Sequence, residues 1–275
     1  MRTSDVAVVV STFNRPQALD LVLAGLARQS VLPLQILIAD DGSRSETADV
    51  IIHWASRGLP IEHCWHADKG FRKTIILNQA ASKICAPYVI FLDGDCIPLK
   101  SFVSDHLKLS GPKTILAGSR VLASQSYTRA LESGAESCFD RGLGYWLIKG
   151  VTGATNRFLP TIRLPDGAWR DLRPENWRLV RGCNFSLFTE DFLLADGFDE
   201  TIVGWGREDS DLAVRLIHLG LRIKSLACAA PVVHLWHQEE SRNRLTLNDR
   251  HLAQTLAEGR TKARTGLSSR INPDD

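Results

Sequence analysis

Two aspartates separated by one glycine follow an apolar run of strand length, and together they could bind a cation. The run Tyr88–Leu92 leads directly into Asp93, Gly94 and Asp95. A buried strand tolerates almost no charge, so both aspartates should lie where the strand emerges from a sheet. Side chains two positions apart on an extended segment point the same way, and Gly94 would let a ligand approach the backbone. A divalent cation with oxygen ligands is the usual counter-charge for such a pair, although a solvated turn explains the three residues equally well.

A second group of acids marks the start of a helix in the last third of the chain. Two glycines flank Trp205, and the acids Glu208, Asp209 and Asp211 follow. The apolar spacing beyond them predicts an amphipathic helix whose first turn holds the acids, where they would stabilise the helix dipole. We favour a functional explanation, because the glycines give a mobile backbone and the indole gives a flat apolar wall. A sugar ring could rest on that wall beside a carboxylate.

Residues that follow two other predicted strands suit a nucleotide. Ser11, Phe13 and Arg15 follow the first apolar run, and Asp41 follows the second. A carboxylate such as Asp41 can accept the N3–H of uracil, and Phe13 can offer a stacking face. A turn with a helix cap at residues 40–43 is a common alternative explanation.

Two adjacent cations, Arg72 and Lys73, lie at the start of another predicted helix. Because a helix N-terminus attracts anions, this pair offers a natural seat for a diphosphate. The first strand is not followed by a Gly-x-Gly-x-x-Gly motif, and no Walker-type loop occurs. These absences argue against a nicotinamide-type Rossmann site and a P-loop.

The elements that must position these residues alternate between strand and helix. Apolar, β-branched runs predict strands at 6–10, 35–39, 61–65 and 88–92, and helical spacing predicts helices at 16–26, 45–56 and about 73–84. Strands and helices joined by short connections are typical of an α/β fold. We therefore expect a mostly parallel central sheet with helices on both faces.

The second half of the chain is less regular. Its patterns predict helices at 101–110, 190–196 and about 248–262, and strands at 114–117, 181–187 and near 232–237. The segment 123–179 has a blurred pattern with many arginines, prolines and tryptophans, as in a lid or binding loop. Trp169 and Trp177 could stack on an acceptor sugar, or they could cover the edge of the core.

Composition excludes several classes of protein. A formal net charge of +2 gives no support for nucleic-acid binding. The sequence has no apolar run of about eighteen residues and no N-terminal signal pattern. Its six cysteines are scattered without paired metal spacing, which suits a reducing compartment. These features predict a cytosolic protein.

Three motifs, in this order and spacing, resemble the nucleotide-binding half of a family 2 glycosyltransferase. They are VVVSTFNRP at 8–16, ADDGS at 39–43 and FLDGD at 91–95. The resemblance implies a GT-A fold and a sugar-nucleotide donor used with a divalent metal. It assigns nucleoside contacts to Ser11, Phe13, Arg15 and Asp41, a basic position near the diphosphate to Arg72, a ribose contact to Asp93 and a metal ligand to Asp95.

The string GWGREDSD at 204–211 resembles the C-terminal region of the galactosyltransferase family, which also occurs in bacterial chondroitin-type polymerases and lipooligosaccharide transferases. That resemblance implies that Asp209 is the catalytic base and that Glu208 and Trp205 lie in the acceptor site. It also implies a metal-binding histidine after the strand near 232, for which His237 has the better spacing. Residues i and i+3 diverge on an extended strand, so His234 and His237 should not both bind unless the chain turns there.

The sequence therefore predicts an inverting, metal-dependent glycosyltransferase. Its donor would be a nucleotide diphosphate sugar, preferably a UDP-sugar, and its acceptor a saccharide or lipid-linked saccharide of a bacterial surface glycan. Mn²⁺ or Mg²⁺ would serve as the cofactor, and one imidazole ligand tilts the choice toward Mn²⁺. Residues 1–120 would bind the donor, 121–240 the acceptor, and 241–275 would form a helix and a basic tail.

Two alternatives accompany this prediction. A sugar-nucleotide pyrophosphorylase uses a similar sheet and metal, but it needs a glycine-rich phosphate loop that the sequence does not contain. A non-catalytic module that binds sugar nucleotides is the second, although such a module usually loses a residue such as Asp95, Asp209 or His237.

The C-terminal tail contains the cations Arg260, Lys262, Arg264 and Arg270. They suggest peripheral contact with acidic lipid, while simple solvation explains them as well.

Overall fold

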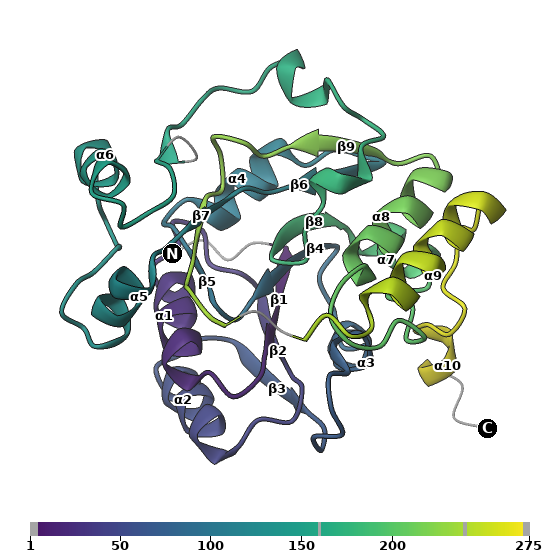
Figure 1. Cartoon of the computed structure of the whole chain (residues 1–275), viewed down its shortest axis with the longest axis horizontal. Helices are drawn as coiled ribbons and strands as arrows, with labels where there is room; N and C mark the ends of the chain where they lie inside the picture. Colours follow the sequence, from purple (N-terminus) through teal and green to yellow (C-terminus); the bar gives the residue numbers. More distant parts are fainter. Residues whose placement is uncertain (1–4, 159–160, 239–240, 272–275) are drawn as a thin grey trace.

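A seven-stranded sheet is the middle layer of the protein in a computed structural model, which describes residues 5–158, 161–238 and 241–271 (Figure 1). The strands follow the order β3-β2-β1-β4-β8-β6-β9. They span Val6–Thr12 (β1), Gln35–Asp40 (β2), Ile61–Trp65 (β3), Tyr88–Asp93 (β4), Thr114–Ala117 (β6), Asn184–Phe188 (β8) and Arg222–Ser225 (β9). Neighbouring strands are parallel except where β8 pairs with β4 and β6. The mostly parallel sheet expected from the sequence is confirmed.

Helices cover both faces of this sheet because its central strands are apolar on both sides. In β1, Val8 and Val10 face one core and Val9 faces the other, as the two-residue period of a strand requires. The helices of the first core are α1 (Pro16–Ala27), α2 (Ser45–Ser56) and α4 (Phe102–Leu109). Those of the second core are α3 (Lys73–Ala81), α7 (Thr189–Leu194) and α8 (Glu208–His218).

A second, three-stranded sheet joins distant parts of the chain. It consists of β5 (Cys96–Pro98), β10 (Val232–His234) and β7 (Arg120–Leu122), in the order β5-β10-β7. Helices α5 (Gln125–Glu132) and α6 (Leu143–Val151) pack beside it around a third apolar cluster. Because β5 directly follows Asp95 and β10 ends at His234, this small sheet brings these two residues to the same place.

The remaining elements show where the sequence-based boundaries were wrong. Two 3-10 helices, Ala168–Asp171 (η2) and Trp177–Leu179 (η3), lie in the irregular segment, and α10 spans Ser268–Ile271. Helix α3 ends at residue 81 rather than near 84. Helix α9 spans Leu245–Glu258, and Gly259 ends it with a φ of 61°. No helix among the described residues is long and apolar enough to cross a membrane.

The two tryptophans of the irregular segment have different surroundings. Trp177 is partly buried and packs against the second core, as the structural alternative expects. Trp169 is 37% exposed, and the guanidinium of Arg170 lies 4.1 Å from its ring centroid. Of the two, Trp169 offers the more accessible ring.

Candidate functional site

The carboxyl ends of β1 and β4 meet at the first acidic motif. Ser11 and Asp93 are paired in register, and the Ser11 hydroxyl donates a hydrogen bond of 2.8 Å to Asp93 Oδ1. The Gly94 N–H donates to the Ser11 carbonyl at 2.7 Å. A Cβ atom on residue 94 would lie 2.6 Å from that carbonyl oxygen. Any other residue at position 94 would collide with the Ser11 carbonyl, so glycine is required there. The expectation that Gly94 leaves room for a ligand was wrong, because the Ser11 backbone occupies that space.

The two aspartates of this motif do not share one counter-charge. Lys73 Nζ lies 2.7 Å from Asp93 Oδ1, whereas Arg15 Nη1 lies 3.0 Å from Asp95 Oδ2. Burial raises the pKa of Asp93, but Lys73 and the Ser11 hydroxyl outweigh burial, and the net pKa is lowered. Each aspartate therefore has a cationic side chain of its own, so the pair does not depend on a single shared counter-charge.

Asp95, His234 and His237 form a cluster suited to a metal ion. One ligand atom from each lies within 4.8 Å of the others. His234 Nε2 is 3.8 Å and His237 Nε2 is 3.4 Å from the Asp95 carboxylate. Strand β10 ends at His234, and the two imidazole centroids lie 5.3 Å apart. The divergence expected for a continuous extended strand does not arise, because the strand ends at His234.

The donor atoms of this cluster fit a divalent cation. Burial lowers the pKa of His234, which keeps its imidazole neutral and able to donate a lone pair near neutral pH. One carboxylate with two imidazoles suits Mn²⁺ better than Mg²⁺, which prefers oxygen ligands alone. The cluster therefore offers three groups to a metal ion and leaves further coordination positions for other ligands.

Arg15 links this cluster to helix α5. Its Nη2 atom lies 3.3 Å from Glu132 Oε1 and also 3.3 Å from the Trp236 carbonyl oxygen. A hollow of about 380 Å³ opens beside these groups, and Arg129 and His237 also line it. The sequence did not suggest Glu132, because nothing in its local pattern connects it to a residue more than a hundred positions away.

The proposed base-recognition residues lie at the ends of β1 and β2. Phe13 is 44% exposed, so a large part of its side chain is accessible to a ligand. Asp41 is buried, and its carboxylate accepts hydrogen bonds from the His66 ring at 2.6 Å and from the Arg72 N–H at 2.8 Å. Burial raises the pKa of Asp41 despite these partners. His66 is a site residue that the sequence did not indicate.

The Arg72 and Lys73 side chains point to different groups. The Arg72 guanidinium donates to the Ala67 carbonyl at 2.5 Å, while Lys73 contacts Asp93. Lys73 is the first residue of α3, so its position at a helix N-terminus agrees with the sequence prediction. Its ammonium nevertheless already neutralises a carboxylate.

A left-handed turn brings the second acidic motif to the same region. Gly204, Gly206 and Arg207 have φ angles of 82°, 97° and 81°, and α8 starts at the next residue. Arginine rarely adopts this conformation, so the turn stores strain immediately before the acids. Trp205 is 38% exposed, and the Arg242 guanidinium lies 5.3 Å from its ring centroid. The indole is thus available as a wall beside the helix start.

Glu208 and Asp209 have contrasting surroundings. Asp209 Oδ2 accepts the Gly182 N–H at 2.8 Å, and its Oδ1 accepts the Ser210 N–H at 2.6 Å. Glu208 Oε1 lies 3.7 Å from Lys73 Nζ, while its buried Oε2 has no hydrogen-bond partner in the described part of the chain. Burial and the neighbouring Asp209 raise the pKa of Glu208 to about 7, although Lys73 opposes them.

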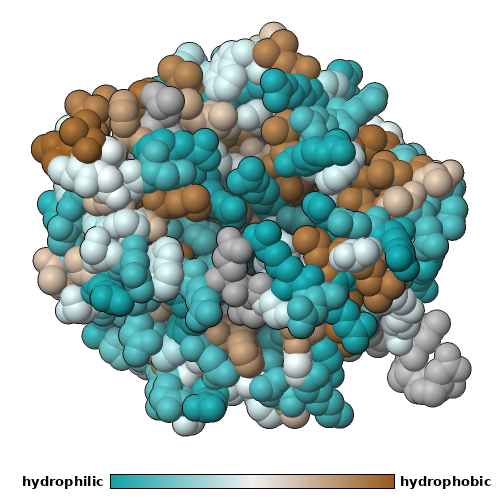
Figure 2. Space-filling view, viewed as in Figure 1, coloured by the Kyte–Doolittle hydropathy of each residue, from teal (hydrophilic) through white to brown (hydrophobic). Residues whose placement is uncertain are grey.

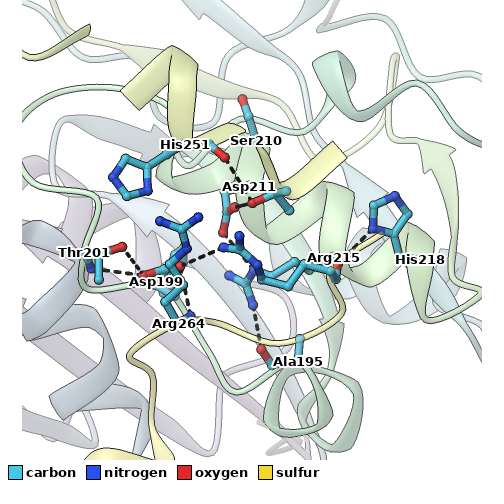
Figure 3. A network of polar contacts seen from close by, with 12 residues as sticks. Ala195, Asp199, Thr201, Ser210, Asp211, Arg215, His218, His251 and Arg264 are labelled. Atoms are coloured by element: carbon cyan, nitrogen blue, oxygen red, sulfur yellow. Dashed lines mark hydrogen bonds and ion pairs between the residues drawn. The ribbon is translucent and has the colours of Figure 1, made fainter. Parts of the chain in front are cut away.

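Asp211, the third acid of the motif, has a structural role. Asp211 and Arg215 are both buried in α8 and form an ion pair of 2.7 Å (Figure 3). Thr255 of α9 donates to the other Asp211 oxygen at 2.7 Å, and Arg215 donates to the Ala195 carbonyl at 2.6 Å. These contacts fix the first turn of α8 against α7 and α9, and so position Glu208 and Asp209.

The C-terminal cations are largely occupied within the molecule. Arg260 contacts Asp199 at 3.8 Å and also pairs with Glu258. Arg264 donates its backbone N–H to Asp199 at 3.0 Å (Figure 3) and its guanidinium to Gln254 at 2.7 Å. Lys262 is exposed, and the Arg270 side chain lies outside the described residues. The contacts of Arg260 and Arg264 weaken the prediction that this tail meets a lipid surface.

Two curated proteins illustrate what this chain is similar to in sequence. The chain is 30% identical over 220 residues to the validoxylamine A glucosyltransferase of Streptomyces hygroscopicus subsp. limoneus, which covers 76% of this chain and 47% of that protein. It is 26% identical over 255 residues to the hyaluronan synthase of Pasteurella multocida. The aligned region covers 85% of this chain and 24% of that protein. The chain thus spans about half or less of the length of these curated relatives.

Solved structures of glycosyltransferases share the GT-A fold of this chain. A mannosyltransferase from Pyrobaculum calidifontis in complex with GDP-Man and Mn²⁺ superposes with a TM-score of 0.59 at 16% identity, over 92% of this chain and 63% of that one. S. aureus TarS 1–349 in complex with UDP gives a TM-score of 0.63 at 14% identity, over 98% of this chain and 68% of that one.

Two sequence families account for both acidic motifs. Residues 172–238, which include the Glu208–Asp209 pair, match the family described as the N-terminal domain of galactosyltransferase. Residues 7–146, just over half of the chain, match glycosyl transferase family 2 and include the motifs at the ends of β1, β2 and β4. The chain belongs to glycosyl transferase family 2.

Proposed function

We propose that this protein is an inverting, metal-dependent glycosyltransferase that moves a sugar from a nucleotide diphosphate sugar to a saccharide hydroxyl. The observation that carries the proposal is the meeting of two chemical groups at one edge of the sheet. The metal-type cluster of Asp95, His234 and His237 follows β4 and β10. The Lys73 ammonium forms ion pairs with both Asp93 and Glu208, and Asp209 is the residue that follows Glu208.

The first group would serve the departing nucleotide. Asp95, His234 and His237 would hold Mn²⁺ or Mg²⁺, and an ion there would neutralise charge on the leaving diphosphate. Arg15 contacts Asp95 and lines the adjacent hollow, where its guanidinium could also contact phosphate oxygens. Phe13 would stack on the base, and the fixed Asp41 carboxylate would accept the N3–H of uracil, so we favour a UDP-sugar.

The second group would serve the acceptor. Trp205 would support the acceptor sugar ring, and Glu208 would hydrogen-bond one of its hydroxyl groups through the unpartnered Oε2. Asp209 would take the proton of the attacking hydroxyl as the new bond forms at the anomeric carbon and the bond to the diphosphate breaks. The Asp209 oxygens retain lone pairs beside the Gly182 and Ser210 N–H bonds, so the carboxylate can still accept this proton. Displacement from the opposite side inverts the configuration.

The relatives suggest the class of acceptor. The similar proteins include a hyaluronan synthase and the chondroitin synthase of Escherichia coli, to which the chain is 24% identical over 246 residues. Both names describe polymers of sugars, which supports a saccharide acceptor. We propose a bacterial surface glycan or a lipid-linked saccharide at the cytoplasmic side of the membrane.

One assay tests the function directly. The purified chain is incubated with a panel of UDP- and GDP-sugars, with Mn²⁺ or with a chelator, and release of the nucleotide diphosphate is measured with and without saccharide acceptors. We expect metal-dependent release from a UDP-sugar and its loss in Asp95→Asn. Binding of the nucleotide sugar without any release, under all these conditions, would identify a non-catalytic module instead.

A further inference from the structure

Helix α6 presents an apolar face to solvent. Leu143, Leu147, Ile148 and Val151 are 53%, 45%, 62% and 79% exposed. They lie at helical spacing on one side of α6, and we call them the α6 patch. Hydrophobic residues gather at the corresponding corner of the space-filling view, at the upper left, where α6 projects from the body of the protein (Figures 1 and 2). Single exposed apolar residues are common, but a contiguous group of this kind is typical of an interaction surface.

The opposite side of α6 is firmly attached, so the exposed patch is not a consequence of a loose helix. Trp146 is 2% exposed and belongs to the third apolar cluster. Lys149 donates a hydrogen bond of 2.6 Å to Glu136, and its ammonium lies 4.9 Å from the Tyr127 ring centroid. The helix is therefore held by its inner face while four aliphatic side chains remain in water.

The charges around the patch favour an anionic partner. The acids at its border are already paired, Glu136 with Lys149 at 2.6 Å and Asp140 with Lys100 at 3.4 Å. Arg141 donates to a backbone carbonyl and stacks 5.0 Å from a tyrosine ring centroid, and Arg157 donates to another backbone carbonyl. Neither arginine forms an ion pair with a carboxylate in the parts of the chain that the structure describes. Their charges are therefore available to an external group.

We propose that the α6 patch binds the surface of a membrane that contains anionic phospholipid. The aliphatic side chains would enter the boundary between headgroups and acyl chains, and Arg141 and Arg157 would contact lipid phosphates. A second copy of the chain fits less well, because a two-fold contact at this patch would bring the same arginines together. Four side chains also provide far less area than the roughly 800 Å² per partner of a stable interface. The proposal does not depend on sugar transfer.

Vesicle co-sedimentation with the full chain tests the patch. We expect the protein to sediment with phosphatidylcholine vesicles that contain about one third phosphatidylglycerol, at roughly physiological salt. The triple variant Leu147→Ser, Ile148→Ser and Val151→Ser should reduce the partition coefficient by on the order of a hundredfold. The matched control, Ile52→Ser with Leu247→Ser and Leu256→Ser, changes three other exposed aliphatic residues on α2 and α9 and should bind as the unmodified chain does.

A second comparison tests the role of charge. Arg141→Gln and Arg157→Gln should each weaken binding to the anionic vesicles by about fivefold and leave binding to pure phosphatidylcholine unchanged. Equal thermal unfolding of all variants checks that the fold is retained. The proposal is overturned if the unmodified chain does not bind anionic vesicles, or if the α6 triple variant binds them as strongly as the unmodified chain does. The oligomeric state is measured by sedimentation equilibrium. If the unmodified chain forms a dimer that the α6 triple variant does not form, and both bind vesicles equally, the patch would be assigned to self-association.

Discussion

Lys73 Nζ lies 3.7 Å from Glu208 Oε1, with both side chains mostly buried between α3 and α8. Burial lowers the pKa of Lys73, but Asp93 and Glu208 outweigh burial and raise it, so the ammonium stays charged. Burial and Asp209 raise the pKa of Glu208 to about 7. Glu208 is therefore the member of this pair that changes its charge near neutral pH.

We predict that Glu208 makes the protein less stable as pH rises. The folded state binds the Glu208 proton more tightly than the unfolded state does, so the stabilisation is complete below the unfolded pKa of 4.5 and is lost as pH rises through about 7. As pH rises from 5 to 8, the free energy of unfolding of Glu208→Gln should therefore increase relative to that of the original chain, by about 3 kcal/mol at most. Urea unfolding of the metal-free protein at both pH values measures this change.

A matched variant distinguishes this effect from a general loss of charge. Glu62→Gln removes a half-exposed glutamate that pairs with Lys83 at the surface, and it should show no comparable pH dependence. The prediction fails if Glu208→Gln and Glu62→Gln differ from the original chain by the same amount at both pH values.

The metal prediction concerns the two histidines. Because His234 and His237 both lie within 4 Å of the Asp95 carboxylate, His234→Ala and His237→Ala should each weaken Mn²⁺ binding by at least about tenfold. Asp95→Ala should abolish it without unfolding the protein, since the residue lies in a turn at the sheet edge. Calorimetric titration with Mn²⁺ alone measures these affinities.

His53→Ala provides the control for histidine loss, because this residue lies on the exposed side of α2, away from the cluster. Normal Mn²⁺ affinity in His234→Ala, together with loss in His237→Ala, would leave His237 as the one histidine ligand. The reverse result would exchange the two assignments.

Base recognition is predicted from the fixed carboxylate of Asp41. The His66 ring and the Arg72 N–H hold Asp41 in one orientation, with lone pairs left for the N3–H of uracil. UDP should therefore bind more tightly than GDP, and Asp41→Asn should reduce the affinity for UDP by roughly tenfold. Calorimetry with both nucleotides compares them. Tighter binding of GDP would contradict the assignment of both Asp41 and Phe13.

The sequence predicted the strand ends well for a physical reason. Apolar runs locate buried parallel strands, and polar residues that follow them must gather at one edge of the sheet. Ser11, Asp41 and Asp93 were found in this way, and their strands have the predicted positions. The acids of α8 were found because amphipathic spacing identifies a helix and its first turn.

The parts that the sequence did not predict depend on contacts between distant segments. His66, Glu132 and Gly182 enter the site through partners at least 25 positions away, and no local pattern marks them. Strands β5 and β7 have three residues each, too few for a periodic pattern. A strand near residue 232 was predicted, but its end at His234 was not, and the approach of both histidines to Asp95 depends on that end.

The base assignment distinguishes two adjacent carboxylates. Asp209 accepts two backbone N–H bonds, whereas the raised pKa of Glu208 favours the protonated form of that neighbour near neutral pH. Under the proposed function, Asp209→Asn keeps the shape but removes the proton acceptor, so donor binding should persist. The rate of transfer should fall by roughly 10²- to 10⁴-fold, the usual contribution of a positioned base.

Glu208→Gln is the matched variant for this prediction, since it changes the adjacent carboxyl group in the same way. It retains a hydrogen-bonding side chain, so it should raise the KM for the acceptor more than it lowers kcat. Donor affinity, kcat and acceptor KM are measured for both variants with one acceptor. If Asp209→Asn turned over at a near-normal rate while Glu208→Gln lost activity, the base would be Glu208. Its pKa of about 7 would then appear as the lower limb of the pH–rate profile, because a base acts only in its deprotonated form.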